Sequence, residues 1–238
     1  MEADGDLDQL LVRKRALEKR ATAMPELAAR LQELRTWQAG RLARTYDDLR
    51  HDPRYSRAVE FFLTDLYGPH DFSPRDRELM RASRYLKRTL PGAARAALER
   101  AIELEVLSAE LDYAMLAVLP AGPLTGGGYA TSYRAVGRRD ARERQIALVL
   151  AVGEDLDHVV RHAWVRSALR LARGPAHAAG FRVLQDFLER GFAAFAKMTD
   201  AQPFLQAIRE RETHLLVKLF AGGGGELFAP ADARSGNG

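Results

Sequence analysis

The sequence predicts an all-α protein, built as a single irregular bundle of about eight to ten helices with a disordered C-terminal tail. Three observations lead to this fold class. No stretch alternates apolar and polar residues with an excess of β-branched side chains, and no Asn-Gly or Asp-Gly pair joins two such stretches. Proline and glycine recur where helices would begin and end. No tandem repeat occurs, which argues against a solenoid.

In the first half of the chain, prolines and charged residues place the helix boundaries. The charged segment 7–20 predicts a first helix that is loosely attached to the rest, and Pro25 begins the next one. Pro53 suits the first turn of a helix that Gly68-Pro69 ends. The run 73–76, Ser-Pro-Arg-Asp, provides an N-cap, a proline in the first turn and an acid, and so begins another helix.

The second half is punctuated in the same way. Pro91 precedes a long helix rich in Ala, Leu and Glu, and 120–128 form a Pro/Gly loop. Gly137 ends a short helix, and Arg173-Gly174-Pro175 ends a helical piece that follows a kink before Trp164. Apart from that piece, the predicted helices cover residues 7–20, 25–49, 53–67, 74–88, 92–118, 129–136, 140–160, 176–198 and 201–220.

The predicted helix 176–198 has an unusually broad apolar face. Its apolar residues share an arc of about 180°, whereas a surface helix shows about 100°. We therefore expect this helix to be central, with Gly180 and Gly191 allowing close contacts. The residues on the apolar arc are Phe181, Leu184, Phe187, Leu188, Gly191, Phe192, Ala194, Phe195 and Met198.

Composition excludes several classes of function. The 238 residues include no cysteine, so disulfides, thiolate metal sites and cysteine nucleophiles are excluded. No apolar run reaches the roughly 18 residues of a membrane span. The acidic start, residues 1–8, is not followed by the apolar segment of a secretory signal, so we expect a cytoplasmic location. The 36 Lys and Arg nearly balance the 32 Asp and Glu, which argues against general nucleic-acid binding.

One segment carries a family resemblance. From Phe61 to Asp76 the chain reads Phe-Phe-Leu-Thr-Asp-Leu-Tyr-Gly-Pro-His-Asp-Phe-Ser-Pro-Arg-Asp. It resembles the proteobacterial FFLEELY-motif family, in which the motif is followed by Gly-Pro, Asp-Phe and Arg-Asp. Thr64 and Asp65 stand where the family usually has two glutamates, which argues against a role for a long carboxylate at position 64. Further similar segments are Tyr133–Gly137, Arg144–Ile146, Arg173–Ala176, Leu184–Phe192 and Arg211–Glu212.

The resemblance covers about residues 50–220 and implies a helical fold and a bacterial origin, but no activity. We therefore divide the chain into a charged helical segment (1–24), a helical FFLEELY-motif domain (25–221) and a disordered Gly-rich tail (222–238).

Several polar residues fall on predicted apolar faces. Asp65 lies between Ala58 and Phe61 on its helical wheel, so it should be partly buried and paired, with Arg75 or Arg134 as the expected partner. Such groups either form a network that fixes helix register or line a ligand pocket between helices. The candidate cluster is Asp65, Tyr67, Tyr133, Arg134, Gln145 and Gln185.

A basic stripe is the second candidate site, and it contains His158, His162, Arg166, Arg170 and Arg173. No acid occurs from Arg161 to Arg173, so the stripe is either a solvated face or a docking surface for a partner. The spacing of Asp155, His158 and His162 would suit a divalent metal. No second matching motif occurs, and we therefore predict surface histidines and no metal site.

No catalytic constellation is found. Gly126-Gly127-Gly128 lacks the Lys-Ser/Thr of a phosphate-binding loop, and no nucleophile elbow occurs. The primary prediction is a non-enzymatic interaction or regulatory protein with an unknown protein partner, or a homodimer. The alternative is a small-molecule or tetrapyrrole-binding helical protein with or without enzymatic activity; His177 is the candidate haem ligand beside an aromatic core. An enclosed pocket lined by residues of the polar cluster would count against the primary prediction.

Overall fold

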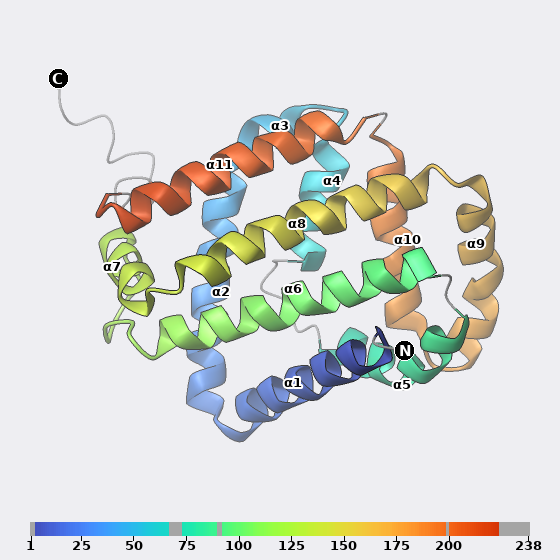
Figure 1. The fold of residues 1–238 in the computed structure, drawn as a ribbon, viewed down its shortest axis with the longest axis horizontal. Helices are drawn as coiled ribbons and strands as arrows, with labels where there is room; N and C mark the ends of the chain where they lie inside the picture. The colour runs from blue at the N-terminus through green and yellow to red at the C-terminus, as the bar shows by residue number, and fades with distance from the viewer. Residues whose placement is uncertain (1–2, 67–72, 90–91, 199, 224–238) are drawn as a thin grey trace.

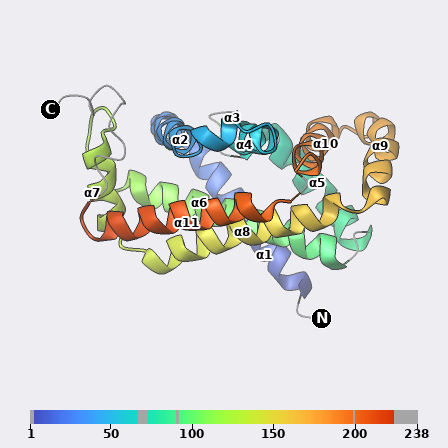
Figure 2. The same cartoon turned by 90° about the horizontal axis from the view of Figure 1, so that it is seen from above.

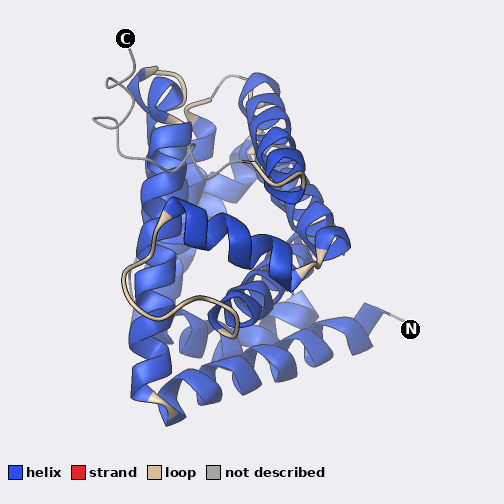
Figure 3. Cartoon of the chain, turned by 90° about the vertical axis from the view of Figure 1, so that its left-hand side faces the viewer, coloured by secondary structure: helices blue, strands red, loops and turns tan. Residues whose placement is uncertain are grey.

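The computed structural model describes residues 3–66, 73–89, 92–198 and 200–223 (Figure 1). Within these ranges the chain forms α-helices and one π-helical turn, and no strand is present (Figure 3). The predicted all-α fold is therefore confirmed. The predicted tail falls largely on residues 224–238, which lie outside the described residues.

The helices follow one another with short connections. They are α1 (Ala3–Ala23), α2 (Pro25–Thr45), α3 (Asp47–His51), α4 (Ser56–Phe61), the π-helix η1 (Phe62–Leu66), α5 (Ser73–Thr89), α6 (Gly92–Leu116), α7 (Gly126–Val136), α8 (Arg139–Val160), α9 (Ala163–Ala178), α10 (Arg182–Ala196) and α11 (Gln202–Phe220). Most predicted boundaries agree within a few residues. The described part holds one α-helix more than the upper expectation, because the predicted helix 25–49 divides at Tyr46.

The helices form two layers (Figure 2). In one layer α1, α6, α8 and α11 run side by side, with α6 in contact with both α1 and α8, and α8 in contact with α11. In the other layer α2, α4 and α10 run across them (Figure 1). Helices α7 and α9 lie at the two ends. The space between the layers is where a cavity described below is found.

The segment that carries the family resemblance does not continue as an α-helix. After Phe61 the chain continues as the wider π-helix η1. At this junction the Phe62 amide donates to the carbonyls of both Ala58 and Val59. A π-helical turn accommodates an extra residue, and such turns often lie at functional sites. Tyr67, the last residue of the predicted motif, lies outside the described residues.

The predicted helix 176–198 is wrong in its first turns. Helix α9 continues through Gly174 and Pro175, and the chain turns at Gly180, whose φ of 78° is left-handed. Pro175 removes one hydrogen bond of α9, but it lies in the last turn, so only three helical residues follow it. The break therefore falls at the glycine. Phe181 consequently becomes the N-cap residue of α10.

The central position expected for this segment is nevertheless correct for α10, which contacts α4, α5, α8 and α9. A Cβ atom on Gly191 would lie 2.8 Å from Cζ of Phe61, so only glycine allows α10 and α4 to approach this closely.

Helix α1 is not loosely attached, contrary to the sequence prediction. Leu7, Leu10 and Leu11 are buried, and α1 packs along α6. Charged residues dominate the segment, and its few leucines form the face that packs against the core. Among the described residues, no helix has the length and apolarity needed to cross a membrane.

Candidate ligand-binding cavity

A cavity of about 750 Å³ lies between the two layers. Residues of α1, α2, α5, α6, α8 and α11 form most of its wall, and side chains of η1, α7 and α10 complete it. Much of the wall is aliphatic, with charged and aromatic side chains interspersed. Its volume is within the roughly 300–1,000 Å³ range of small-molecule pockets.

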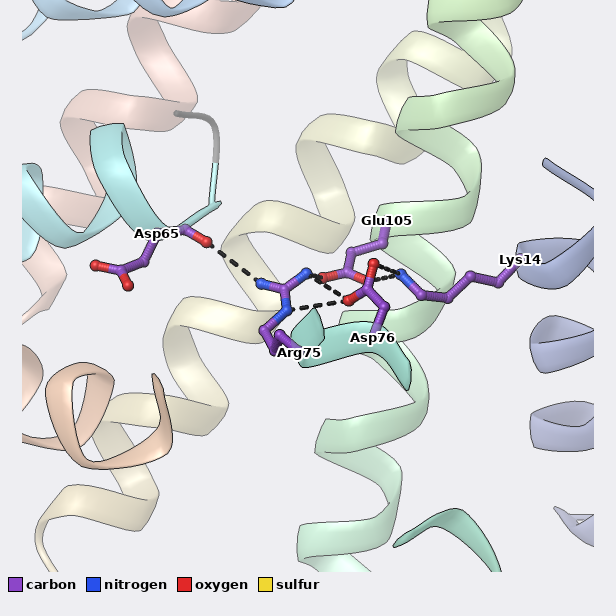
Figure 4. Close-up of polar contacts among 5 residues, drawn as sticks. All are labelled: Lys14, Asp65, Arg75, Asp76 and Glu105. Atoms are coloured by element: carbon purple, nitrogen blue, oxygen red, sulfur yellow. Dashed lines mark hydrogen bonds and ion pairs between the residues drawn. The ribbon is translucent and has the colours of Figure 1, made fainter. Parts of the chain in front are cut away.

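A closed network of four charged side chains forms one part of this wall (Figure 4). The Lys14 ammonium lies 2.9 Å from a carboxylate oxygen of Asp76 and 2.5 Å from one of Glu105. The Arg75 guanidinium donates to the same two acids at 2.9 and 2.5 Å, and Arg75 also donates to the Asp65 main-chain carbonyl at 3.3 Å. Two cations and two anions thus join α1, α5, α6 and η1.

Burial and charge compete in this network. For Glu105 burial favours the neutral form, but Lys14 and Arg75 outweigh it and lower the pKa. For Lys14 burial opposes the charge, but Glu105 and Asp76 outweigh it and raise the pKa. Glu18 lies nearby on α1; burial raises its pKa, and Asp76 and Glu105 add to that effect. Lys14 and Glu105 therefore stay charged around neutral pH, whereas the pKa of Glu18 is shifted in the direction that favours its neutral form.

A second group of polar contacts crosses the cavity between α2 and α11. Arg41 donates to Glu212 at 2.6 Å, and the Tyr46 hydroxyl donates to the same carboxylate oxygen at 2.8 Å. Burial, with the Glu212 charge, raises the pKa of Tyr46, so its hydroxyl remains protonated. Farther along α2, Arg35 pairs with Asp112 of α6 at 3.2 Å. These contacts hold α2 against the other layer, and Glu212 and Asp112 are each paired with an arginine.

Arg142 is different from these cations. It is 7% exposed, and its Nη1 donates to Oε1 of Gln145 at 3.2 Å. The guanidinium lies over the Tyr133 ring, with Cζ 4.5 Å from the ring centroid. Gln145 in turn donates to Oγ of Ser108 at 2.8 Å, so these side chains form a hydrogen-bonded chain along the cavity wall.

The structure brings together two residues of the predicted polar cluster. Tyr133 and Gln145 both line the cavity, and Arg142 links them. Arg134 is exposed on α7 and does not line it. Of the five predicted members that the structure describes, only these two come together, because Asp65, Arg134 and Gln185 do not line the cavity.

Asp65 and Gln185 make separate contacts. Arg190 donates to Asp65 at 2.6 Å, so the expected partners Arg75 and Arg134 are wrong for this carboxylate. Gln185 is buried and donates to the Leu169 carbonyl at 2.8 Å, where it joins α10 to α9. Both contacts tie helices together, which agrees with the structural interpretation of these polar residues.

The basic stripe is exposed along its length but does not follow one helix. His158 belongs to α8 and His162 caps α9, so the chain changes direction between them. Their Nε2 atoms lie 3.3 Å apart. Farther along, Arg173 pairs with Glu189 at 3.0 Å, and Arg166 and Arg170 line a groove between α9 and α10.

The described residues do not form a cluster of ligands for the metal or haem alternatives. No group of three or more metal-binding side chains occurs among the described residues. The Asp155 carboxylate forms an ion pair with Arg100 at 2.6 Å, so it is not available to share a metal ion with His158 and His162. His177 lies 3.2 Å from Asp186 and is not part of the cavity wall.

Sequence reasoning missed Arg142 and the Lys14 network. Arg142 lies three residues before Gln145 on the same face of α8, and this spacing was the available signal. The pairing of Lys14 with residues 76 and 105 has no signal in a single sequence, because it depends on how distant helices pack.

Comparisons with known proteins give a family but no function. Residues 17–224 match the family model described as a domain of unknown function, DUF8198. Searches of curated proteins and of solved structures found no match.

Proposed function

We propose that this chain, which belongs to the family of domains of unknown function DUF8198, binds a small molecule in its central cavity. This is the alternative predicted from the sequence, in its small-molecule form. The observation that carries it is the cavity of about 750 Å³, whose largely aliphatic wall presents Arg142, Gln145 and Tyr133. Binding sites for small molecules combine apolar walls with a few polar groups in this way.

The character of the wall indicates the kind of ligand. Because much of the wall is aliphatic, it favours a molecule with an apolar body, and the few polar side chains would fix the orientation of that molecule.

The test uses N-phenyl-1-naphthylamine, a neutral dye whose fluorescence rises in apolar surroundings. We expect saturable binding with one site per chain. Ala109 lines the cavity, so Ala109→Phe should fill part of it and reduce binding at least about tenfold. Ala172→Phe, on the exposed surface of α9, is the matched control and should bind like the wild type. Absence of saturable binding, or equal binding by Ala109→Phe, would overturn the proposal.

The haem form of this alternative has less support. The described wall contains no histidine. Tyrosine is one residue type in this described wall whose side chain is known to ligate haem iron. A visible spectrum after haem addition tests it: a Soret band with a ligand-specific shift would support haem binding, and its absence would remove it.

A second candidate is the interaction or regulatory role that the sequence predicts. No residue of α9 is buried, and Trp164 and Leu171 are 61% and 78% exposed beside the basic stripe. Large exposed apolar side chains of this kind are enriched at protein interfaces. For the homodimer form, sedimentation velocity should show concentration-dependent association that Leu171→Ser weakens and Val217→Ser, on α11, does not. A monomer at all concentrations would contradict it.

The predicted cytoplasmic location, bacterial origin and relation to the FFLEELY motif stay predictions. We propose no reaction, and we retain the expectation that nucleic acid is not the partner.

A further inference from the structure

The wall of the cavity contains one buried cation without an anion among the described residues. Arg142 Nη2 is buried and has no hydrogen-bond partner there, and the side chain makes no ion pair. Its contacts are the Gln145 amide oxygen and the face of Tyr133. Both are weaker than a carboxylate as partners for a buried guanidinium, since removing a charge from water is costly unless it is paired.

The other cations of the wall are matched. The ion pairs are Lys14 and Arg75 with Asp76 and Glu105, Arg35 with Asp112, and Arg41 with Glu212. The remaining acid of the described wall is Glu18, and no ion pair joins it to Arg142. The positive charge of Arg142 therefore has no counter-ion among the described residues.

The surroundings of Arg142 suit an anionic head with an apolar body. The Tyr133 ring orients the guanidinium from one face, and Gln145 holds Nη1, so the free Nη2 has a fixed position. The fork of an arginine matches carboxylate, phosphate and sulfonate oxygens. Beyond it, the aliphatic side chains of α8 and α11 provide the apolar wall; they include Ile146, Val149, Ile208, Leu215, Leu216 and Leu219.

We propose that Arg142 binds the anionic group of a small molecule whose apolar body fills the cavity. The ligand class is an amphiphilic organic acid that carries one carboxylate, phosphate or sulfonate. This inference rests on the proposed function, because it requires that the cavity take up a ligand.

A matched pair of dyes separates the two claims. 1-Anilinonaphthalene-8-sulfonate has the ring system of N-phenyl-1-naphthylamine with an added sulfonate. We expect the wild type to bind the sulfonate at least about tenfold more tightly than the neutral dye. Arg142→Leu should remove this preference, because it should weaken binding of the sulfonate far more than binding of the neutral dye, and Arg142→Lys should retain part of it. Arg144→Leu, which removes an exposed arginine of the same helix, is the control and should keep it.

The outcomes are distinguishable. If the neutral dye binds but the sulfonate gains nothing, or if Arg142→Leu keeps the preference, the inference about Arg142 is overturned and the cavity proposal stands. If neither dye binds, the proposed function itself fails. In competition, benzoate and phenyl phosphate should displace the bound sulfonate dye more effectively than benzyl alcohol. Equal displacement by all three would contradict an anion site.

Discussion

Arg190 donates two hydrogen bonds to a single carboxylate oxygen of Asp65, at 2.9 Å from Nε and 2.6 Å from Nη2. The pair joins the central helix α10 to the π-helix η1. Thr64 donates to the other Asp65 oxygen at 3.0 Å, and Arg75 reaches the Asp65 carbonyl. Both carboxylate oxygens of Asp65 therefore accept hydrogen bonds.

Removing the arginine of this pair should destabilise the fold. Arg190→Leu leaves the Asp65 side chain, which is 16% exposed, without its cation, and we predict a loss of about 1–3 kcal/mol in unfolding free energy. Urea denaturation measures it. The matched control is Arg182→Leu on the same helix. Its side chain is 76% exposed, so it should change stability by less than about 0.5 kcal/mol. Equal effects of the two variants would show that the Asp65 contact contributes nothing.

The Lys14 network should contribute more. Lys14→Met leaves the buried Asp76 and the partly buried Glu105 with Arg75 as their cation, and breaking a buried ion network costs about 3–5 kcal/mol. Guanidinium denaturation checks this value. Lys19→Met, which replaces an exposed lysine of the same helix, should have little effect. A loss no larger than that of the control would contradict the docked position of α1.

The same network predicts a pH dependence. The pKa of Glu105 is lowered from 4.5, so its contribution is present above pH 4.5 and is lost as the pH falls through the lowered value. The pKa of Lys14 is raised from 10.5, so its contribution is present below pH 10.5 and is lost as the pH rises through the raised value. The stability difference between wild type and Lys14→Met should be largest between these limits. A stability difference that does not fall at either end of the pH range, in strong acid or in strong base, would contradict this assignment.

The charge of Glu18 should lower the stability of the fold, in contrast to the charges of Lys14 and Glu105. Its raised pKa means that the folded state favours the protonated acid, so stability is lost as the pH rises through the raised value. Glu18→Gln should therefore raise the melting temperature at pH 7 by at most about 2–4 °C, and the gain should disappear in acid. Differential scanning calorimetry at several pH values measures it. A gain that is independent of pH would mean that the charge of Glu18 is not involved.

Gly191 should resist substitution because of Phe61. A methyl group there would overpack the interface between α10 and α4 at a cost of about 1–3 kcal/mol, against a helix gain of about 1 kcal/mol for replacing glycine. Gly191→Ala should thus be destabilising, and Phe61→Leu should cost less in that background than in the wild type. Gly40→Ala is the control: its Cβ would meet the Arg44 side chain at an ordinary 3.6 Å, so it should stabilise. Stabilisation by both alanines would contradict the close packing.

The fold could be predicted to a large extent because its signals are local. Proline at the start of α2 and glycine at the end of α7 act within one turn, and they placed the helices within a few residues. Prediction failed where a local signal competed with packing. The sequence predicts a stop at Pro175, whereas α9 continues through it to Ala178 and the chain turns at Gly180.

The candidate site could be predicted only in part. Tyr133 and Gln145 were identified as polar residues on apolar faces, and both line the cavity. The grouping with Asp65 and Gln185 failed because a helical wheel gives the face of a residue but not the helix it meets. Arg142 went unnoticed because its significance lies in a missing counter-ion, which a single sequence does not reveal.

The central claim is that the cavity between the layers takes up a small molecule. Its most direct test is a crystal structure of the protein grown with N-phenyl-1-naphthylamine. We predict electron density for the dye between α2 and α8, beside Tyr133 and within reach of Arg142. Dye bound elsewhere, with side chains or ordered water filling the cavity, would contradict the claim.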